Sequence, residues 1–214
     1  TAAKQLVSLK DVAIDMPAGP SEVEVIADET ANPDFIAADF LSQAEHGADS
    51  QAILVTSAEN MVSSVAEAIR RQLSALSRQE ITEKALEHSR IIVLKDEQEV
   101  IDFTNMYAPE HLIIQTGNYA YIAEQIENAG SVFMGPYTPE SAGDYASGTN
   151  HTLPTNGYAK AYSGVNLDSF IKKITFQEIT AEGIRSLGGT IQVMAGNEQL
   201  DAHRNAVTIR LKTI

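Results

Sequence analysis

The 214-residue sequence contains no cysteine. Disulfide bonds and thiolate metal sites are therefore excluded, and any metal ion must be bound by imidazole nitrogen, carboxylate oxygen or amide oxygen. A chain without disulfides is compatible with the reducing cytoplasm, which we predict as its location. The sequence also lacks a GxGxxG fingerprint, so spacing alone does not predict a dinucleotide site.

Basic residues are scarce as well. Lys and Arg number 15 against 29 Asp and Glu, which gives a formal net charge of -14. Such a chain lacks the positive charge that binds phosphate backbones or anionic lipids, so nucleic acids and membranes are poor partners. It also has no run of about 18 apolar residues, and residues 1–9 show no charged-then-apolar signal pattern. A small-molecule substrate fits these features better.

Short β-branched runs alternate with amphipathic stretches over most of the chain. Each predicted strand is a short apolar run flanked by polar or turn residues. The predicted strands are Val23–Ala27, Ala52–Thr56, Ile91–Leu94, Leu112–Gln115 and Ser131–Phe133. The predicted helices are Pro33–Glu45, Ala58–Leu76, Gln79–His88, Glu97–Tyr107 and Tyr119–Asn128. The alternation indicates an α/β fold with a mainly parallel sheet.

The pattern changes in the last third of the sequence. Residues Gly135–Gly164 are rich in Gly, Pro, Ser, Thr, Asn and Tyr and show no sustained period. We predict a long ordered loop there, and such loops are usually functional. Beyond Asn166, apolar residues that include Phe170 and Ile174 recur at helical spacing, which predicts a helical tail. This tail could cover a sheet or pack on another subunit.

Gln43 and His46 lie three residues apart at the end of a predicted helix, so their side chains can converge on one point. Gln43 stands where the apolar face marked by Ile36 and Phe40 should continue. One interpretation is a pair of metal ligands. The other is a solvated glutamine beside a capping histidine, because a match of two residues is frequent by chance.

Glu110 and His111 lie side by side after Pro109 and just before a predicted strand. Ligands of α/β sheets gather at strand ends, and histidine suits general-base chemistry near neutral pH. Adjacent residues of an extended chain point to opposite faces, so both can serve one substrate only if the chain turns there. A surface Glu–His pair is the alternative interpretation.

The run Ser141–His151 is the strongest local signal within the predicted loop. Gly143 and Gly148 permit close backbone approach, while Asp144 and His151 supply groups for metal binding or proton transfer. Asp144 could instead cap a turn.

His203 lies in a predicted helix, Glu198–Arg210. Glu198 precedes it by five residues, so the two side chains point about 140° apart and cannot both bind one atom directly. A lone histidine in a helix is usually structural, and we interpret His88 at a helix end in that way. Four of the five histidines nevertheless lie beside other ligating groups, which makes a zinc site with nitrogen and oxygen ligands plausible.

Several of these runs together resemble histidinol dehydrogenase, in the order and at the spacing of that family. The runs are Ile14–Glu22, Leu41–Gly47, Pro109–Leu112 and Ser141–His151. The resemblance extends over essentially the whole chain and is to the family's C-terminal half. It implies an incomplete Rossmann-like domain at residues 21–165, a remnant of an upstream nucleotide-fold layer at residues 1–20, and a helical, dimer-forming tail at residues 166–214.

The resemblance also implies a zinc- and NAD-dependent oxidation of L-histidinol to L-histidine through the aldehyde, in two hydride transfers. The implied zinc ligands are Gln43, His46, Asp144 and His203, with His203 reaching the partner's site in a homodimer. His111 would remove the hydroxyl proton, and Glu110 would help to activate the water that hydrates the aldehyde. The implied substrate contacts are Ser21, Gln43, His46, His111, Asp144, His151, Glu198 and His203.

Part of the usual family chain has no counterpart here. Roughly its first half is absent, with most of the expected NAD contacts, and a chain that begins at Thr1 without methionine is expected to be a fragment. We therefore predict that it does not turn over histidinol alone. Two other functions remain open: a metal-dependent hydrolase, in which zinc keeps an open position for hydroxide, and a non-catalytic zinc-binding module that forms dimers.

Overall fold

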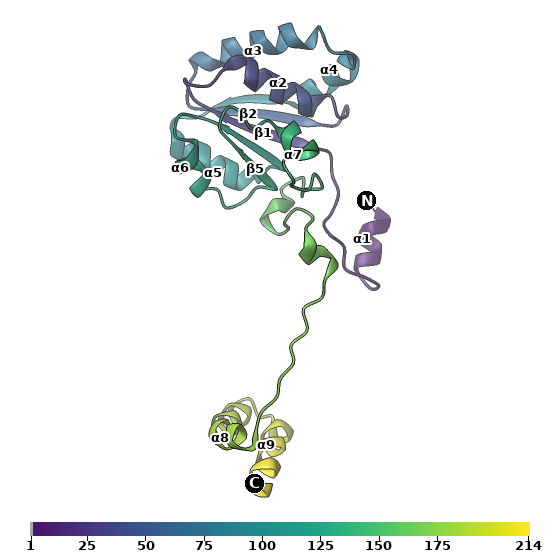
Figure 1. Ribbon diagram of the computed structural model, residues 1–214, viewed down its shortest axis with the longest axis vertical. Helices are drawn as coiled ribbons and strands as arrows, with labels where there is room; N and C mark the ends of the chain where they lie inside the picture. The colour runs from purple at the N-terminus through teal and green to yellow at the C-terminus, as the bar shows by residue number, and fades with distance from the viewer. Residues whose placement is uncertain (1) are drawn as a thin grey trace. The chain divides into compact units, whose positions relative to one another are not determined.

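The computed structural model describes residues 2–214 (Figure 1). The chain divides into two compact units, Thr1–Ile171 and Lys172–Ile214, and each is described by itself. The first residue of the predicted remnant at residues 1–20 lies outside the described residues. The rest of that segment contains helix α1 (Ala2–Ser8), none of whose residues is buried. Within residues 2–214, no helix is both long and apolar enough to cross a membrane.

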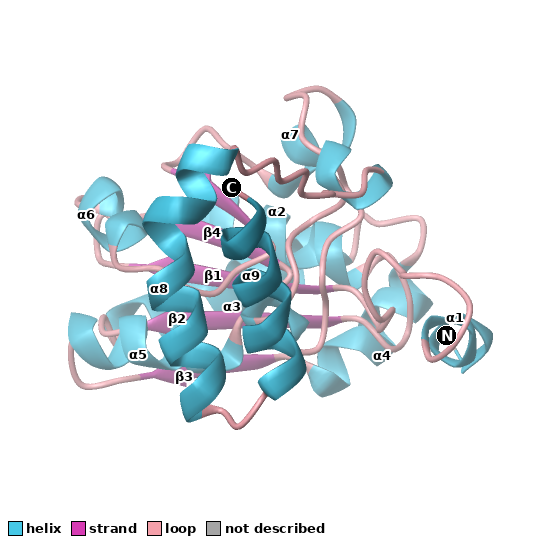
Figure 2. Cartoon of the chain, turned by 90° about the horizontal axis from the view of Figure 1, so that it is seen from below, coloured by secondary structure: helices cyan, strands magenta, loops and turns pink. Residues whose placement is uncertain are grey.

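The first unit is built on one five-stranded sheet whose paired strands are all parallel. The strands are β1 (Glu22–Ala27), β2 (Gln51–Thr56), β3 (Arg90–Val93), β4 (His111–Gln115) and β5 (Ser131–Met134). Their spatial order is β3-β2-β1-β4-β5, and Figure 2 shows β3, β2, β1 and β4 side by side. The predicted α/β fold with a mainly parallel sheet is confirmed, and every predicted strand is found within one residue at either end.

Helices connect the strands, as the alternation predicted. They are α2 (Pro33–Ala44), α3 (Asn60–Leu73), α4 (Gln79–His88), α5 (Glu97–Tyr107) and α6 (Tyr119–Glu124). Helix α2 begins with Asn32 as N-cap, whose side chain accepts a hydrogen bond of 2.9 Å from the backbone nitrogen of Asp34. Helix α6 ends earlier than predicted because the Asn105 side chain accepts the backbone N–H groups of the residues that follow.

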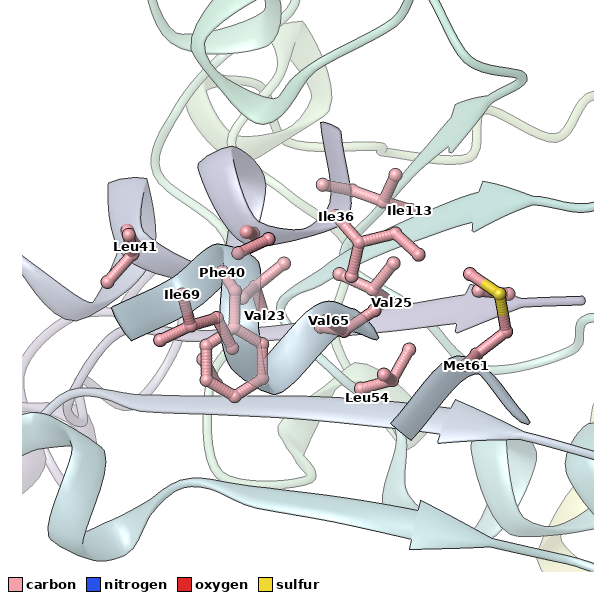
Figure 3. Close-up of a cluster of buried hydrophobic side chains, with 14 of the residues drawn as sticks. Val23, Val25, Ile36, Phe40, Leu41, Leu54, Met61, Val65, Ile69 and Ile113 are labelled. Carbon is pink, nitrogen blue, oxygen red and sulfur yellow. The ribbon is translucent and has the colours of Figure 1, made fainter. Parts of the chain in front are cut away.

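Both faces of the sheet are covered, which explains why β1, β2 and β4 are buried along almost their whole length rather than at alternate residues. Helices α2 and α3 pack on one face, and α5 and α6 cover the other (Figure 1). Figure 3 shows the first of these clusters, which includes Val23, Val25, Ile36, Phe40, Leu54, Val65 and Ile69. Each such side chain contributes about 1.5–3 kcal/mol when fully buried, so this packing fixes the strand ends that carry the site.

The segment Gly135–Gly164 is not a loop throughout, and that prediction is wrong in part. It contains helix α7 (Glu140–Tyr145) and a short 3-10 helix, Tyr158–Lys160. Helix α7 has only six residues, so it is too short to show a helical period in the sequence. It packs closely on β5: a Cβ atom on Gly143 would lie 2.6 Å from a ring carbon of Phe133.

The second unit consists of helices α8 (Ala181–Asn197) and α9 (Asp201–Thr213), which pack against each other. A Cβ atom on Gly188 of α8 would lie 2.8 Å from the Leu211 side chain of α9. Gln192 also donates a hydrogen bond of 2.6 Å to the Thr208 hydroxyl. The pair of helices therefore has its own small interface.

Two predictions for the tail are wrong. Phe170 ends a 3-10 helix, and Ile174 lies in a stretch, residues 171–180, that has no regular structure. Branched isoleucine and threonine residues in this stretch lower its helix propensity. The predicted helix Glu198–Arg210 also fails at its start, because Glu198 caps α8 and the next residue, Gln199, has a left-handed φ of 60°.

Glu24 is a carboxyl group whose protonation is controlled by burial in the first unit. Its side chain is fully buried in β1, accepts a hydrogen bond from Thr104, and has one oxygen without a partner. Burial raises the pKa of Glu24 from 4.5 to about 8. Protonated Glu24 therefore stabilises the folded chain relative to the unfolded chain, in which this carboxyl group already ionises near pH 4.5. The stabilisation is fully present below pH 4.5 and is lost as the pH rises through about 8.

We expect Glu24→Gln to match the unaltered chain at acidic pH and to exceed it near pH 8 by on the order of 2–4 kcal/mol in the free energy of unfolding. Urea denaturation across this pH range measures the effect, and Glu29→Gln at an exposed position is the control. Parallel pH profiles for Glu24→Gln and the unaltered chain would contradict the prediction.

The contact between α7 and β5 gives a second prediction. Gly143→Ala forces a methyl group against Phe133 and is expected to lower the free energy of unfolding by about 1–3 kcal/mol. Gly189→Ala is the matched control in α8, since a Cβ atom there meets nothing within 4 Å and alanine favours a helix by about 1 kcal/mol. Denaturation curves in which both substitutions act alike would refute the assignment of close packing to α7.

Candidate functional site

The candidate site lies at the amino-terminal edge of the sheet, where β1 and β4 begin. Ser21 immediately precedes β1, and Glu110 precedes β4, whose first residue is His111. This is the edge opposite to the carboxyl ends at which open parallel sheets usually bind ligands. A pocket of about 270 Å³ opens here, lined by Ser21, His46, Glu110, His111, Asp144, Tyr145 and His151.

Glu110 and His111 are buried, with exposed fractions of 5% and 4%, so the interpretation as a surface pair is wrong. Helix α5 is followed by its C-cap Ala108 in the left-handed conformation, with φ 57°, and this turns the chain before the pair. Both side chains can therefore line one pocket although they are adjacent in sequence. The backbone N–H of Glu22 donates to Glu110 Oε2 at 2.9 Å and fixes the carboxylate.

The hydrogen bonds of His111 orient its ring. Its Nδ1 lies 3.2 Å from the backbone oxygen of Glu22, and because a carbonyl oxygen only accepts, Nδ1 carries the proton. Glu110 Oε2 lies 3.6 Å from Nδ1, which is too long for a hydrogen bond. The other ring nitrogen, Nε2, is buried without a hydrogen-bond partner and lies 4.0 Å from Asp144 Oδ1.

Charge around His111 favours its protonated form. Burial lowers the pKa of the imidazole, but the neighbouring carboxylates of Glu110 and Glu140 outweigh this effect and raise the pKa to about 9. The imidazole is therefore protonated at neutral pH when no other cation is bound nearby. This pocket concentrates negative charge around a single buried histidine.

The predicted ligand residues Gln43, His46 and Asp144 come together around a fourth residue, Glu140. Gln43 lies in α2 and His46 follows the end of that helix, whereas Glu140 and Asp144 lie four residues apart in α7 and share a face. One ligating atom each from His46, Glu140 and Asp144 lies within 4.8 Å of the others. His46 Nε2 is 4.0 Å from Glu140 Oε1.

Gln43 is fully buried, so it is not the solvated glutamine of the alternative interpretation. One end of its amide lies 2.8 Å from Glu140 Oε1 and 3.1 Å from Oε2, and the amide is assigned with its nitrogen at this end, so that it donates to the carboxylate. Glu140 itself is 1% exposed, and burial, with nearby carboxylates, raises its pKa to about 8 although the charge of His111 acts in the opposite direction.

Sequence reasoning missed Glu140. The available signal was its position four residues before Asp144 and directly after Pro139, which is typical of a helix start with both carboxylates on one face. The irregular composition around Glu140 indicated a loop, and in a loop a spacing of four residues does not predict that two side chains lie on the same side. Its role in the site follows only from the helix that the structure contains.

The donor atoms in this cluster fit a zinc ion. Imidazole nitrogen, carboxylate oxygen and amide oxygen are all zinc ligands, and the buried Nε2 of His111 lies beside them without a partner. Ser21 and His151 line the same pocket. Glu198 and His203 belong to the second unit, where Glu198 caps α8 and His203 is exposed in the first turn of α9. Their place in the site stays a prediction.

Comparison with known proteins gives one consistent result. The family model described as histidinol dehydrogenase matches residues 1–211. Histidinol dehydrogenase of Bacteroides thetaiotaomicron is 67% identical over all of this chain and 50% of its own length. That of Haemophilus influenzae is 55% identical over 99% of this chain and 49% of its own length.

A solved structure agrees with these sequences. The crystal structure of histidinol dehydrogenase from Elizabethkingia anophelis matches with a TM-score of 0.96 and 59% identity, over 100% of this chain and 49% of that chain. The chain thus spans about half the length of the relatives it matches. On its sequence and on its fold, this chain belongs to the histidinol dehydrogenase family.

Proposed function

We propose that this chain supplies the zinc-binding and proton-transfer residues of an NAD-linked enzyme that oxidises L-histidinol to L-histidine. The observation that carries the proposal is the meeting of three potential zinc ligands, Gln43, His46 and Asp144, with the buried pair Glu110 and His111. Family membership supports the substrate, because the relatives are named for it. It also favours this reaction over metal-dependent hydrolysis.

Gln43, His46 and Asp144 would hold the zinc ion in the first unit, and His203 would complete the set. When bound, zinc would orient the substrate by binding its imidazole and amino groups. Ser21, His151 and Glu198 would make further substrate contacts, together with the ligand residues and His111. NAD would accept a hydride in each of the two oxidations, and we assign none of the described residues to binding it.

His111 would act as the base in the first oxidation. Its Nδ1 proton is held by the Glu22 carbonyl, so Nε2 is the atom that would take the hydroxyl proton of the substrate. A cation bound beside Asp144 would oppose the carboxylates that keep the imidazole protonated and would favour the neutral ring. The fixed ring orientation is the feature of this chain that suits the role.

Glu110 would act in the second oxidation. The aldehyde must gain a water molecule before it can lose another hydride, and a carboxylate can take the proton that this water releases. The hydrogen bond from the Glu22 backbone nitrogen holds Glu110 beside His111 in the same pocket. The chain has no cysteine, so a hydrated aldehyde suits its residues better than a thioester.

We propose that the second unit serves a homodimer and brings His203 to the partner's site. Helices α8 and α9 and the turn between them leave large apolar side chains at least two-fifths exposed, as expected of an interface. These are Leu187, Val193, Met194, Leu200 and Ile209. Because the chain spans half the length of its relatives, we propose that it binds zinc and dimerises without turning over histidinol alone. A cytoplasmic location stays a prediction.

Subunit mixing tests the shared site. His46→Ala and His203→Ala should each weaken zinc binding at least tenfold. A mixed dimer of these two variants contains one site with both histidines intact, so an exchanged mixture should regain a class of sites with the original affinity. Calorimetric zinc titration of each variant and of the mixture measures this, with His88→Ala at the end of α4 as control. A mixture that binds no better than its components would contradict the exchange of His203.

A further inference from the structure

Glu140 has no part in the zinc binding or proton transfer proposed above, yet it is 1% exposed at the centre of the cluster. A carboxylate is costly to bury unless hydrogen bonds or charges compensate. One terminal atom of the Gln43 amide lies 2.8 Å from Glu140 Oε1 and 3.1 Å from Oε2, and it is assigned as the nitrogen because an ionised carboxylate can only accept a hydrogen bond. Gln43 is fully buried too, so the two side chains determine each other's orientation.

The chemistry of a carboxamide makes that orientation important. The oxygen of the amide can bind a metal ion, whereas its nitrogen only donates hydrogen bonds. An ionised carboxylate only accepts hydrogen bonds, so Glu140 in this form attracts the nitrogen of Gln43 and leaves the oxygen as the atom available to an ion. Without an acceptor at this place, the amide can rotate and present its nitrogen to the ion instead.

We infer that Glu140 is a positioning residue that orients the Gln43 amide so that its oxygen binds the ion held by His46 and Asp144. The inference rests on the proposed zinc site and adds the group that prepares one of its ligands. Helix α7 combines two functions, because it carries both Asp144 and, one turn earlier, Glu140. Hydrogen bonds from such supporting groups orient metal ligands in many proteins.

A reciprocal exchange tests this role. Glu140→Gln replaces an acceptor-only carboxylate with an amide that can either accept or donate, so it no longer selects one orientation of Gln43 and should weaken zinc and cobalt binding about 10–100-fold. Adding Gln43→Glu should restore most of the affinity, because the amide now on α7 can donate to one oxygen of the carboxylate now on α2 and leave the other oxygen for the ion. We would titrate both metals into the metal-free chain and record the cobalt absorption spectrum, which reports the ligands and their geometry. Glu124→Gln, an exposed carboxylate at the end of α6, controls for lost charge.

Each outcome has a distinct meaning. Equal affinities and cobalt spectra for the unaltered chain and Glu140→Gln, with only the melting temperature of the metal-free chain changed, would show a merely structural role and overturn the inference. A double variant as weak as Glu140→Gln would also overturn it, because Glu140 would then be bound directly to the ion. Failure of the unaltered chain to bind zinc would overturn the zinc site and the inference together.

If the single variant Glu140→Gln does not fold, we would instead compare the single variant Gln43→Glu with the double variant that carries both substitutions. Gln43→Glu alone places two carboxylates against each other and should lower the affinity, and the exchanged pair should recover at least tenfold. Equal affinities for these two variants would contradict the positioning role.

Discussion

The burial of negative charge at one edge of the sheet is the constraint on which the site depends. Glu22, Glu110 and Glu140 are each no more than 8% exposed, and the buried residues of the described chain include no lysine or arginine. His111 is the one buried imidazole among them. Such an arrangement costs free energy unless a cation or protons balance it. Burial, with the neighbouring carboxylates, raises the pKa of Glu140, and the carboxylates raise the pKa of His111; a divalent ion would oppose both effects.

The fold places these groups by simple means. Parallel pairing puts the starts of β1 and β4 side by side, so the backbone of Glu22 can bind both Glu110 and His111. The end of α2 and the short helix α7, which lie far apart in the sequence, then supply the potential ligands at this edge. Apolar packing on both faces of the sheet holds the strand ends in register. The precise chemistry of the site therefore relies on an ordinary α/β scaffold.

How far the sequence predicts this structure depends on the length of each element. The strands are recognisable as short apolar runs and the long helices by their period, and Gln43 can be recognised because a polar residue interrupts an apolar face. Glu140 escapes such reasoning because the six residues of α7 cover fewer than two turns. The left-handed Gln199 and the branched residues of 171–180 break predicted helices, since backbone conformation there overrides the apolar spacing. Strand order depends on crossovers that no local pattern records.

Diffraction data collected at the zinc absorption edge, from crystals of the chain grown with zinc, test the central claim most directly. We predict an anomalous peak bonded to Gln43, His46 and Asp144, with the amide nitrogen of Gln43 turned toward Glu140. A well-ordered site without a peak at this position, or a zinc ion bound elsewhere on the chain, would contradict the account.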